Sequence, residues 1–525
     1  MTRADLSKKV LLLLLLTICL HAGEVVQAQS TNASTLELYV DSVYGSDFFP
    51  GTYTFPKRTL QGAIAKAQDG ASQKLILHLF PRTSDYVFSD TAVNGTLLPN
   101  NIKILSVDPS TTPKADTAVI LVNENVEFES VSLLFEHVII GNDNQTNVST
   151  ISIKRSNLTI SQSTILITAP KETPDSANDI GLFYLDHSNM NIEDVTFNSS
   201  SYTKVMQGSR SVAVFQNISL KCFLSTNLVS VPFMFDQSNL TIDTMTFEGF
   251  YNPLDFRKGS EDQDSAVIQL NMGSFVMKNT LYIAGNTYPI KLFLGANTQA
   301  TIQNFTAKNS RLGANILEFR SVGASPVKVK ITGFYILDNW LFVNSYSGLV
   351  PTGLIYFCAT WELYQPFIAS IDDMVIKNNT QIETNEPQTS IILAYGSRKQ
   401  FVSITNVVMR NNSIKNSFIT VNSNAEQFLL QNLTITNNTF YGPLLRFQPQ
   451  KSNEMEIADM SIQENSFFNT SLMELSGHEI EYKVNRNGSD ADYLRVTRIS
   501  LKNNTFEQTG RLTNEITSLI ICSDF

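Results

Sequence analysis

From about residue 130 to its last residue, the sequence repeats one short pattern. Each copy has an apolar anchor, two residues, a second apolar residue, one residue and a third apolar residue, usually followed by Asn. Repetition at a period of 23 to 35 residues predicts that each unit is one turn of a stacked array, stable only against its neighbours. The anchors are Phe135, Ile160, Ile192, Phe215, Ile242, Met277, Ile302, Ile331, Ile371, Ile404, Leu430, Ile457 and Val496.

The repeat has the alternation of β-strands. In the copies at 242–247, 371–376 and 457–462, apolar residues alternate with Thr, Val or Ser. Short strands with no amphipathic helix between them predict an all-β fold, a parallel β-solenoid. A second strand is expected before the anchors, at 182–185, 267–270, 316–319, 354–357, 444–447 and 472–475.

Asn and Asp recur at two positions of the repeat, where the chain must turn. These residues tolerate the left-handed backbone of a sharp corner, and stacked Asn side chains can hydrogen-bond from turn to turn. The first column, two residues after the anchor, contains Asp194, Asn217, Asn279, Asn304, Asp373, Asn406, Asn432 and Asp459. The second, seven or eight residues after it, contains Asn142, Asn309, Asn339, Asn378, Asn411, Asn437, Asn465 and Asn503.

Residues 1–28 have the pattern of a secretory signal peptide. Lys8 and Lys9 precede an apolar stretch at 10–20, and Val26-Gln27-Ala28 is a small-residue cleavage site. The stretch is shorter than the roughly 20 apolar residues that span a membrane. We therefore expect a secreted or cell-surface chain with a cap and first turns at 29–110 and parallel β-helix repeats at 111–525.

Charge and cysteine content narrow the range of partners. The net charge of −10 disfavours nucleic acid and other polyanions. After loss of the leader with Cys19, only Cys222, Cys358 and Cys522 remain, too few for a disulfide framework. We interpret these three as buried small side chains.

The N-terminal region carries a motif. It reads Tyr39-Val40-Asp41, then Gly45-Ser46-Asp47, Gly51-Thr52, Pro56 and 59–64. With the repeat, this motif resembles the right-handed parallel β-helix proteins of the pectin-lyase-like superfamily, many of them secreted. The resemblance implies a right-handed, single-stranded parallel β-helix with a short capping helix. Thr59 is a suitable N-cap, and Leu60, Ala63, Ile64 and Ala67 share one helical face.

The resemblance also implies where catalysis would occur. Polysaccharide-cleaving members gather acids from adjacent turns, or hold calcium beside a basic residue, so acids should recur in one column. They do not. The outward position of the second strand is occupied by Tyr184, Met234, Gln269, Glu318, Tyr356, Leu393, Thr420, Arg446 and Glu474. That of the anchor strand is occupied by Thr196, Ser219, Thr246, Thr306, Tyr335, Val375, Val408, Thr434, Ser461 and Ser500.

Isolated features do not assemble into an active site. Asp372-Asp373 and Gly477-His478 are similar to catalytic elements of hydrolases in the superfamily, but several turns separate them. Arg446 and Glu474 are expected to form a surface ion pair. The acidic run at 260–264 is interpreted as a solvated loop, with calcium as the alternative. We predict no catalytic residue, no cofactor and no metal ligand.

Sequons for N-glycosylation are frequent, but many arise from the repeat itself. Asn94, Asn144 and Asn487 lie in polar loops outside the corner columns and are the predicted sites. At the corners we expect a stacked amide that cannot also carry a glycan. The corner sequons are Asn217, Asn304, Asn432, Asn378, Asn411, Asn437 and Asn503.

Loops that lengthen a turn are the expected binding sites. They carry aromatic residues that suit a sugar ring or a protein partner. These candidates are Tyr251, Phe256, Arg257, Trp340 and Trp361. The chain stops after 517–522, an apparent strand, so we expect a continuation or a partner at that edge.

Our hypothesis is a non-catalytic extracellular or cell-surface glycoprotein that serves in adhesion, carbohydrate or protein binding, or as a structural rod. The alternative is a polysaccharide lyase or glycoside hydrolase of the pectin-lyase-like group, with a site built by loops.

Overall fold

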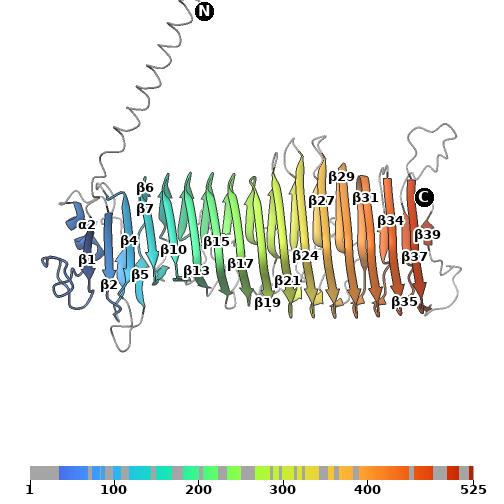
Figure 1. Ribbon diagram of the computed structural model, residues 1–525, viewed down its shortest axis with the longest axis horizontal. Helices are drawn as coiled ribbons and strands as arrows, with labels where there is room; N and C mark the ends of the chain where they lie inside the picture. The colour runs from blue at the N-terminus through green and yellow to red at the C-terminus, as the bar shows by residue number, and fades with distance from the viewer. Residues whose placement is uncertain are drawn as a thin grey trace, which may run out of the picture.

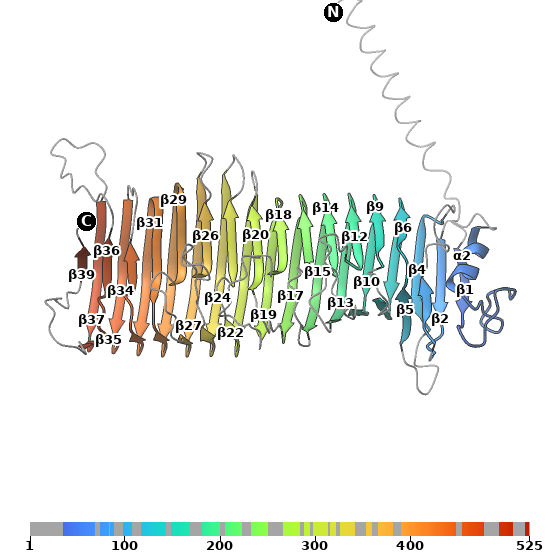
Figure 2. The same ribbon diagram turned by 180° about the vertical axis from the view of Figure 1, so that it is seen from behind.

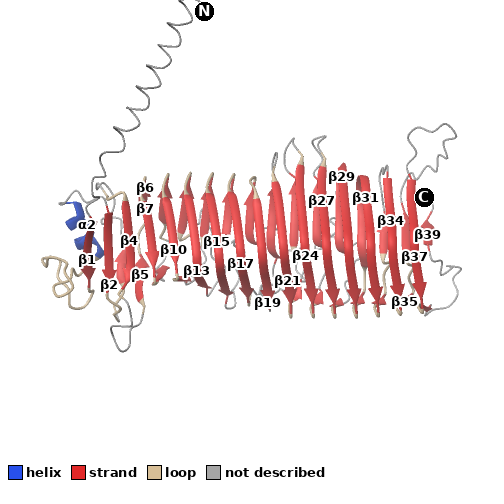
Figure 3. Cartoon of the chain, viewed as in Figure 1, coloured by secondary structure: helices blue, strands red, loops and turns tan. Residues whose placement is uncertain are grey.

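The computed structural model confirms the predicted solenoid. It describes residues 35–68, 74–82, 84–88, 98–107, 117–142, 149–167, 181–199, 205–222, 233–249, 266–283, 288–294, 298–312, 316–321, 326–341, 353–359, 366–381, 390–447, 454–476, 493–507 and 520–523. The strands among these residues pair in parallel, and the turns stack into a long rod (Figures 1 and 3). The chain is a right-handed parallel β-helix.

The predicted anchors occupy one register column. Phe135 pairs with Ile160, and the same register continues from turn to turn as far as Val496. Three earlier strands extend the column through Leu38, Leu77 and Ile104. We call these strands the anchor column: β1 (Thr35–Val40), β2 (Lys74–Leu79), β4 (Asn101–Ser106), β7 (Ser132–Glu136), β10 (Asn157–Ser161), β13 (Asn189–Ser199), β15 (Val212–Cys222), β17 (Asn239–Glu248), β19 (Phe275–Ile283), β21 (Gln299–Lys308), β24 (Val327–Leu337), β27 (Phe367–Lys377), β29 (Ser390–Arg410), β31 (Ser417–Thr436), β34 (Glu454–Gln463) and β37 (Tyr493–Lys502).

A second column precedes the anchors, as predicted. β29 and β31 are long enough to belong to both columns. The other strands of this pre-anchor column are β6 (Val126–Glu129), β9 (Ile151–Lys154), β12 (Phe183–Asp186), β14 (Met206–Ser209), β16 (Phe233–Asp236), β18 (Ala266–Asn271), β20 (Tyr288–Leu294), β23 (Leu317–Ser321), β26 (Gly353–Ala359), β33 (Leu445–Phe447), β36 (Met473–Ser476) and β39 (Ile520–Ser523).

Two further sets complete the turns. Near the N-terminus, the other strands are β3 (Tyr86–Phe88), β5 (Ala118–Val122), β8 (Val138–Asn142) and β11 (Thr164–Ile167). In the C-terminal half a separate sheet of very short strands, the short sheet, follows the anchor strands. It contains β22 (Arg311–Leu312), β25 (Trp340–Leu341), β28 (Thr380–Gln381), β30 (Ser413–Ile414), β32 (Thr439–Phe440), β35 (Ser466–Phe468) and β38 (Thr505–Glu507).

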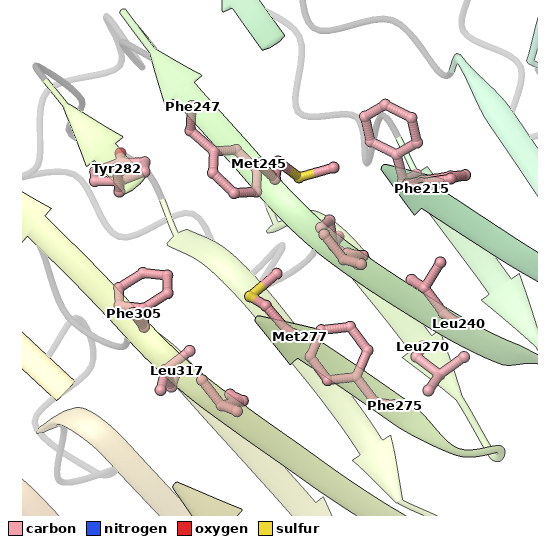
Figure 4. Packing of buried hydrophobic residues seen from close by; sticks show 14 of the residues in the cluster. Phe215, Leu240, Met245, Phe247, Leu270, Phe275, Met277, Tyr282, Phe305 and Leu317 are labelled. Carbon is pink, nitrogen blue, oxygen red and sulfur yellow. The ribbon is translucent and has the colours of Figure 1, made fainter. Parts of the chain in front are cut away.

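One apolar core runs along the inside of the rod. Alternate residues of most strands are buried, as in β17, where Leu240, Ile242, Met245 and Phe247 point inward. Figure 4 shows part of this core between Phe215 and Leu317. Because each turn buries its apolar face only against the next turns, the core is stable as a stack and not as separate units.

The first corner column is confirmed in full. All eight predicted Asn and Asp residues have the left-handed backbone, with φ between 50° and 59°. At this corner the side chains also bond along the rod: Asn304 donates to Asn279 at 3.1 Å, and Asn279 donates to Asp243 at 2.9 Å. Most of this corner therefore uses residue types that tolerate the left-handed backbone, and Thr244 and Arg498 are exceptions, with φ of 61° and 53°.

The second predicted column is wrong in one respect, because it merges two neighbouring positions. Residues such as Asn378 and Asn411 have positive φ and are exposed. The residue after each is a buried Asn, and Asn339 and Asn465 belong to this second, buried set. We call this set, with the half-buried Asn504 that continues it, the amide ladder: Asn339, Asn379, Asn412, Asn438, Asn465 and Asn504.

The capping helix is confirmed. α2 (Leu60–Gln68) and β1 lie at one end of the rod, and β37 lies at the other (Figures 1 and 2). The Thr59 hydroxyl accepts a hydrogen bond from the Gly62 N–H at 2.9 Å, as an N-cap does. The helical face predicted to cover the first turn is buried. Among the described residues, no helix is long and apolar enough to cross a membrane.

Candidate functional site

The outer face of the pre-anchor column is where the resemblance would place catalytic acids. Its register is confirmed from Tyr184 to Glu474, and β14 and β20 add Gln207 and Lys291, which the sequence analysis missed. The expectation that this face is solvated is wrong at its centre. There Tyr356, Leu393 and Thr420 are at most 3% exposed, although Tyr356 and Leu393 lie outside the main core cluster.

Charged and polar groups at this centre pair with one another. Glu318 and Arg320 form an ion pair on β23, next to Tyr356 and Cys358 on β26. Burial would lower the pKa of Arg320, but the Glu318 carboxylate raises it overall. Burial raises the pKa of the Tyr356 hydroxyl and of the Cys358 thiol, so both groups stay protonated at neutral pH.

The Asp pair has structural partners. Asp372 accepts hydrogen bonds from the Thr405 hydroxyl at 2.8 Å and the Asn406 amide at 2.7 Å, which lowers the pKa of Asp372. Asp373 occupies the first corner with φ of 59° and accepts a hydrogen bond from the Tyr335 hydroxyl at 2.8 Å. Gly477 and His478 lie outside the described residues, as does the acidic run at 260–264.

The predicted ion pair is confirmed. Arg446 and Glu474 face each other on adjacent turns with a nitrogen to oxygen distance of 3.0 Å. Within the described part of the chain, no three His, Cys, Asp or Glu side chains are grouped so that they could hold a metal ion.

Most predicted binding and glycosylation residues lie outside the described residues: Tyr251, Phe256, Arg257, Trp361, Asn94, Asn144 and Asn487. Trp340 is described, and its side chain is 56% exposed on β25. Its neighbour in the short sheet is Thr380 on β28. The Trp340 side chain is therefore exposed to solvent, and its role in binding stays a prediction.

A larger exposed apolar surface lies next to the capping helix, in residues 42–58, which we call the aromatic loop. Six large apolar side chains of this loop are at least 36% exposed. Exposed apolar side chains that cluster mark interaction sites more often than scattered ones do. They are Val43, Tyr44, Phe48, Phe49, Tyr53 and Phe55, with Phe48 exposed at 100%.

Backbone hydrogen bonds hold the aromatic loop against β1. The Tyr39 N–H donates to the Gly51 carbonyl, the Lys57 N–H donates to the Tyr39 carbonyl and the Asp41 N–H donates to the Lys57 carbonyl, each at 2.8 Å. Gly45 is required for this packing, since a Cβ there would lie 2.2 Å from the Lys57 carbonyl oxygen. The loop is thus a fixed structure that presents its side chains.

Two carboxylates, those of Asp41 and Asp47, hold the ends of the loop in place. Asp41 accepts hydrogen bonds from the Val43 and Tyr44 N–H groups at 3.0 Å and forms an ion pair with Arg82 at 2.6 Å. Burial would raise the pKa of Asp41, but Arg82 and the two N–H groups lower it overall. Asp47 accepts hydrogen bonds from the N–H and the hydroxyl of Thr59, so the loop is tied to the start of α2.

The aromatic rings also support one another. Phe49 and Phe55 meet edge to face with centroids 5.7 Å apart, and Tyr53 meets Tyr39 in the same way at 5.4 Å. Arg82 lies over the Tyr44 ring at 5.1 Å. These contacts leave Phe48 and one side of the other rings in solvent.

The sequence analysis used this segment only as a motif and missed its exposed surface. A signal was present: five aromatic residues lie between Tyr44 and Phe55 without the spacing of a strand or helix. Aromatic residues without such a period have no regular face to bury, so they were candidates for exposure.

No protein-family model matches the sequence, and no curated protein matches it. Among solved structures, the chain is similar to the catalytic domain of GH87 alpha-1,3-glucanase in complex with nigerose, with 12% identity over 85% of this chain and 67% of that one and a TM-score of 0.37. It is also similar to PfbA, a surface adhesin of Streptococcus pneumoniae, with 13% identity over 79% and 89% and a TM-score of 0.31. The periplasmic alginate epimerase AlgG matches with 9% identity over 80% and 84% and a TM-score of 0.25.

The class of protein follows from the strand pairing of the chain itself. Parallel strands that stack turn on turn from β1 to β37 define a parallel β-helix protein. This fold carries both binding proteins and enzymes, so the function has to be argued from the surface.

Proposed function

We propose that this chain is a non-catalytic β-helix rod, located outside the cell or on its surface, that binds a protein partner through the aromatic loop. The observation that carries the proposal is a rigid loop with six exposed large apolar side chains. Burying a Phe side chain contributes about 1.5 to 3 kcal/mol, so a few such contacts suffice for specific binding.

The chemistry of the loop favours an apolar protein surface over a sugar. Its aliphatic hydroxyl groups help to hold the loop together: the Thr52 hydroxyl accepts the Phe55 N–H at 3.2 Å, and the Ser42 and Ser84 hydroxyls bond to each other at 2.8 Å. A sugar would need free polar groups beside the rings, whereas an apolar patch on a protein does not.

The few charged residues of the loop also favour an apolar protein surface as the partner. Asp47, Lys57 and Arg58 are the charged residues of the loop. The Asp47 carboxylate accepts hydrogen bonds from the backbone N–H groups of Arg58 and Thr59, and the Lys57 ammonium donates to the Asp47 carbonyl at 2.6 Å. Binding driven by such a surface is expected to depend little on ionic strength.

The position of the loop suits a binding rod. It lies beside α2 at one end of the stack, far along the axis from β37 (Figure 1). The reason to place the rod outside the cell is the secretory leader proposed at 1–28. N-terminal sequencing of the secreted protein would detect cleavage after Ala28. Tyr251, Phe256, Arg257, Trp340 and Trp361 remain secondary contacts in this proposal.

The test is binding of the purified rod to the surface of the cells that produce it. We expect Phe48→Ser to weaken binding at least about tenfold, since tenfold corresponds to 1.4 kcal/mol, less than one buried Phe. Val408→Ser, which removes an exposed apolar side chain from β29 in the middle of the rod, is the matched control. Binding should survive high salt and be lost when the cells are treated with protease.

Other outcomes would overturn the proposal. Binding abolished by periodate but not by protease would identify a carbohydrate, and binding to protein-free lipid vesicles would identify a membrane. A rod that dimerises in solution, and that Phe48→Ser makes monomeric, would identify a second copy as the occupant.

A polysaccharide-cleaving enzyme is the second candidate. The observation in its favour is the group of buried Glu318, Tyr356 and Thr420 with half-buried Arg320 on the outer face of the pre-anchor column. Incubation with pectic and other acidic polysaccharides tests it. If the protein released new reducing or unsaturated ends and the Arg320→Ala variant did not, the chain would be an enzyme and the proposed binding function would be wrong.

A further inference from the structure

Four turns of the C-terminal half carry the triplet Asn-Asn-Thr or Asn-Asn-Ser, and its two Asn residues have opposite environments. In each triplet the first Asn is exposed and the second belongs to the amide ladder. The triplets begin at Asn378, Asn411, Asn437 and Asn503. The first Asn of each is the acceptor of an N-glycosylation sequon.

The exposed Asn stands at the tip of a corner. Its φ is 57° at Asn378, 56° at Asn411, 54° at Asn437 and 52° at Asn503. Its side chain lies on the surface of the rod, outside the strands on either side. A group attached to the side-chain nitrogen therefore extends into solvent.

The buried Asn carries out the stacking that the sequence analysis assigned to the corner. The Asn412 amide donates to the Ile376 carbonyl at 2.9 Å and to Asn438 Oδ1 at 2.8 Å, while Asn412 Oδ1 accepts the N–H and the amide of Asn379 at 2.9 Å. The turns are joined by this ladder, so the exposed amide is not needed to hold them together.

Hydrogen bonds at the exposed corner leave room for a glycan. Asn411 Nδ2 donates one hydrogen to Asn378 Oδ1 at 3.2 Å, and Asn378 Nδ2 donates one to Asp338 at 2.9 Å. An amide nitrogen has two hydrogens, and a glycosylated one keeps one of them. The bond along the corner and the glycan are therefore compatible.

The third residue of each triplet occupies the outward position of the short sheet. Thr380, Ser413, Thr439 and Thr505 pair in register, and none of them is buried. The sequon hydroxyl thus lies on the outer surface beside its Asn.

We propose that Asn378, Asn411, Asn437 and Asn503 are N-glycosylation sites that line one edge of the rod. In the reaction, Nδ2 loses one hydrogen as it bonds to C1 of a lipid-pyrophosphate-linked oligosaccharide. The C1–O bond to pyrophosphate breaks, and the lipid pyrophosphate leaves with the proton. The proposal shares with the proposed function only the passage of the chain through a secretory compartment.

The stacking of the turns predicts a pattern of occupancy. The corners of Asn378, Asn411 and Asn437 lie on consecutive turns, about 4.8 Å apart, whereas Glu464 separates Asn437 from Asn503. Asn503 should therefore be the most fully occupied site. Asn411, which has a sequon on both sides, should be the least occupied.

The experiment is secretion of the chain from eukaryotic cells behind an unrelated signal peptide, followed by peptide mass spectrometry. Enzymatic release of N-glycans should convert Asn437 and Asn503 to Asp, and Thr439→Val and Thr505→Val should each abolish the conversion at one site. The matched control is Asn465→Gln, which alters the ladder next to Glu464, a corner residue without a sequon, and should leave occupancy of the four sites unchanged.

A secreted, folded rod in which all four Asn are unmodified would overturn the proposal, whether or not Asn94, Asn144 and Asn487 carry glycans. The unrelated signal peptide separates this result from a failure of the native leader. Binding through the aromatic loop, measured on the enzymatically deglycosylated rod, reports on the proposed function independently.

Discussion

Between residues 156 and 238 the turns are joined by buried serines, whereas between 339 and 504 they are joined by buried asparagines. Each Ser hydroxyl accepts one backbone N–H from the preceding turn and donates to the carbonyl two residues before it. The Ser211 hydroxyl, for example, accepts the Ser188 N–H at 3.1 Å and donates to the Ser209 carbonyl at 2.7 Å. Each ladder amide accepts and donates more bonds and touches the next amide directly. A hydroxyl thus closes a corner locally, whereas an amide links successive corners.

The largest expected effect is in the amide ladder. Asn412→Ala removes three amide hydrogen bonds and leaves the N–H of Asn379 without its acceptor. At about 1 to 3 kcal/mol per buried unsatisfied group, we expect a loss of about 3 to 5 kcal/mol in the free energy of unfolding, measured by urea denaturation. Asn411→Gly, one residue away on the exposed corner, keeps the left-handed backbone free of strain; it is the control and should cost less than about 0.5 kcal/mol.

A smaller effect is expected in the serine half. Ser211→Ala leaves only the Ser188 N–H without its acceptor, so the expected loss is about 1 to 2 kcal/mol in the same assay. If Ser211→Ala cost as much as Asn412→Ala, the difference between the two ladders would not exist.

Acid should weaken the N-terminal end before either ladder. Burial lowers the pKa of His78, which stacks on Tyr39 at 4.6 Å, so the fold favours the neutral imidazole. The stability that this provides is present above the unfolded pKa of about 6.5 and is lost as the pH falls below it. His78→Phe should reduce this acid sensitivity in hydrogen exchange at β1 and β2, and His187→Phe should not.

The same exchange experiment has a second step. Because the pKa of Asp41 is lowered in the fold, its contribution is lost only as the pH falls below about 3.8. This order would be contradicted if, as the pH falls, the aromatic loop and the two ladders lost their protection from hydrogen exchange together in one step.

The smallest effect is expected from the surface ion pair. Arg446 and Glu474 are partly exposed, and such pairs contribute less than about 1 kcal/mol. A double-mutant cycle with Arg446→Ala and Glu474→Ala should give a coupling energy in that range, which falls with added salt. A larger, salt-independent coupling would assign the pair a role beyond the surface.

The regular part of the fold was predictable because a strand repeat leaves a strict alternation. The anchor column follows from apolar spacing, and the capping helix follows from the resemblance of the N-terminal motif, supported by the Thr59 N-cap and one apolar helical face. The strand β14 was missed because Gly208 occupies a position where an apolar residue is expected. A Cβ there would lie 2.5 Å from the Phe235 ring, so the next turn supplies the missing volume.

Other features depend on contacts that spacing does not encode. In an Asn-Asn pair either residue can be the buried one, and a shift of one position exchanges inside and outside. Tyr356 and Leu393 are buried on the outer face, which the alternation within one strand cannot reveal. The aromatic loop has no period, which marks its rings as candidates for exposure, but only the folded backbone determines which of them lie in solvent.

The amide ladder gives the rod a direction. In each bond the backbone N–H of one turn reaches the side chain of the turn that follows it in the chain, from Ser310 and Asn339 through to Asn504. During synthesis, each newly completed turn therefore presents a donor that only the next segment to emerge can satisfy, so the C-terminal half should assemble in chain order, one coil templating the next.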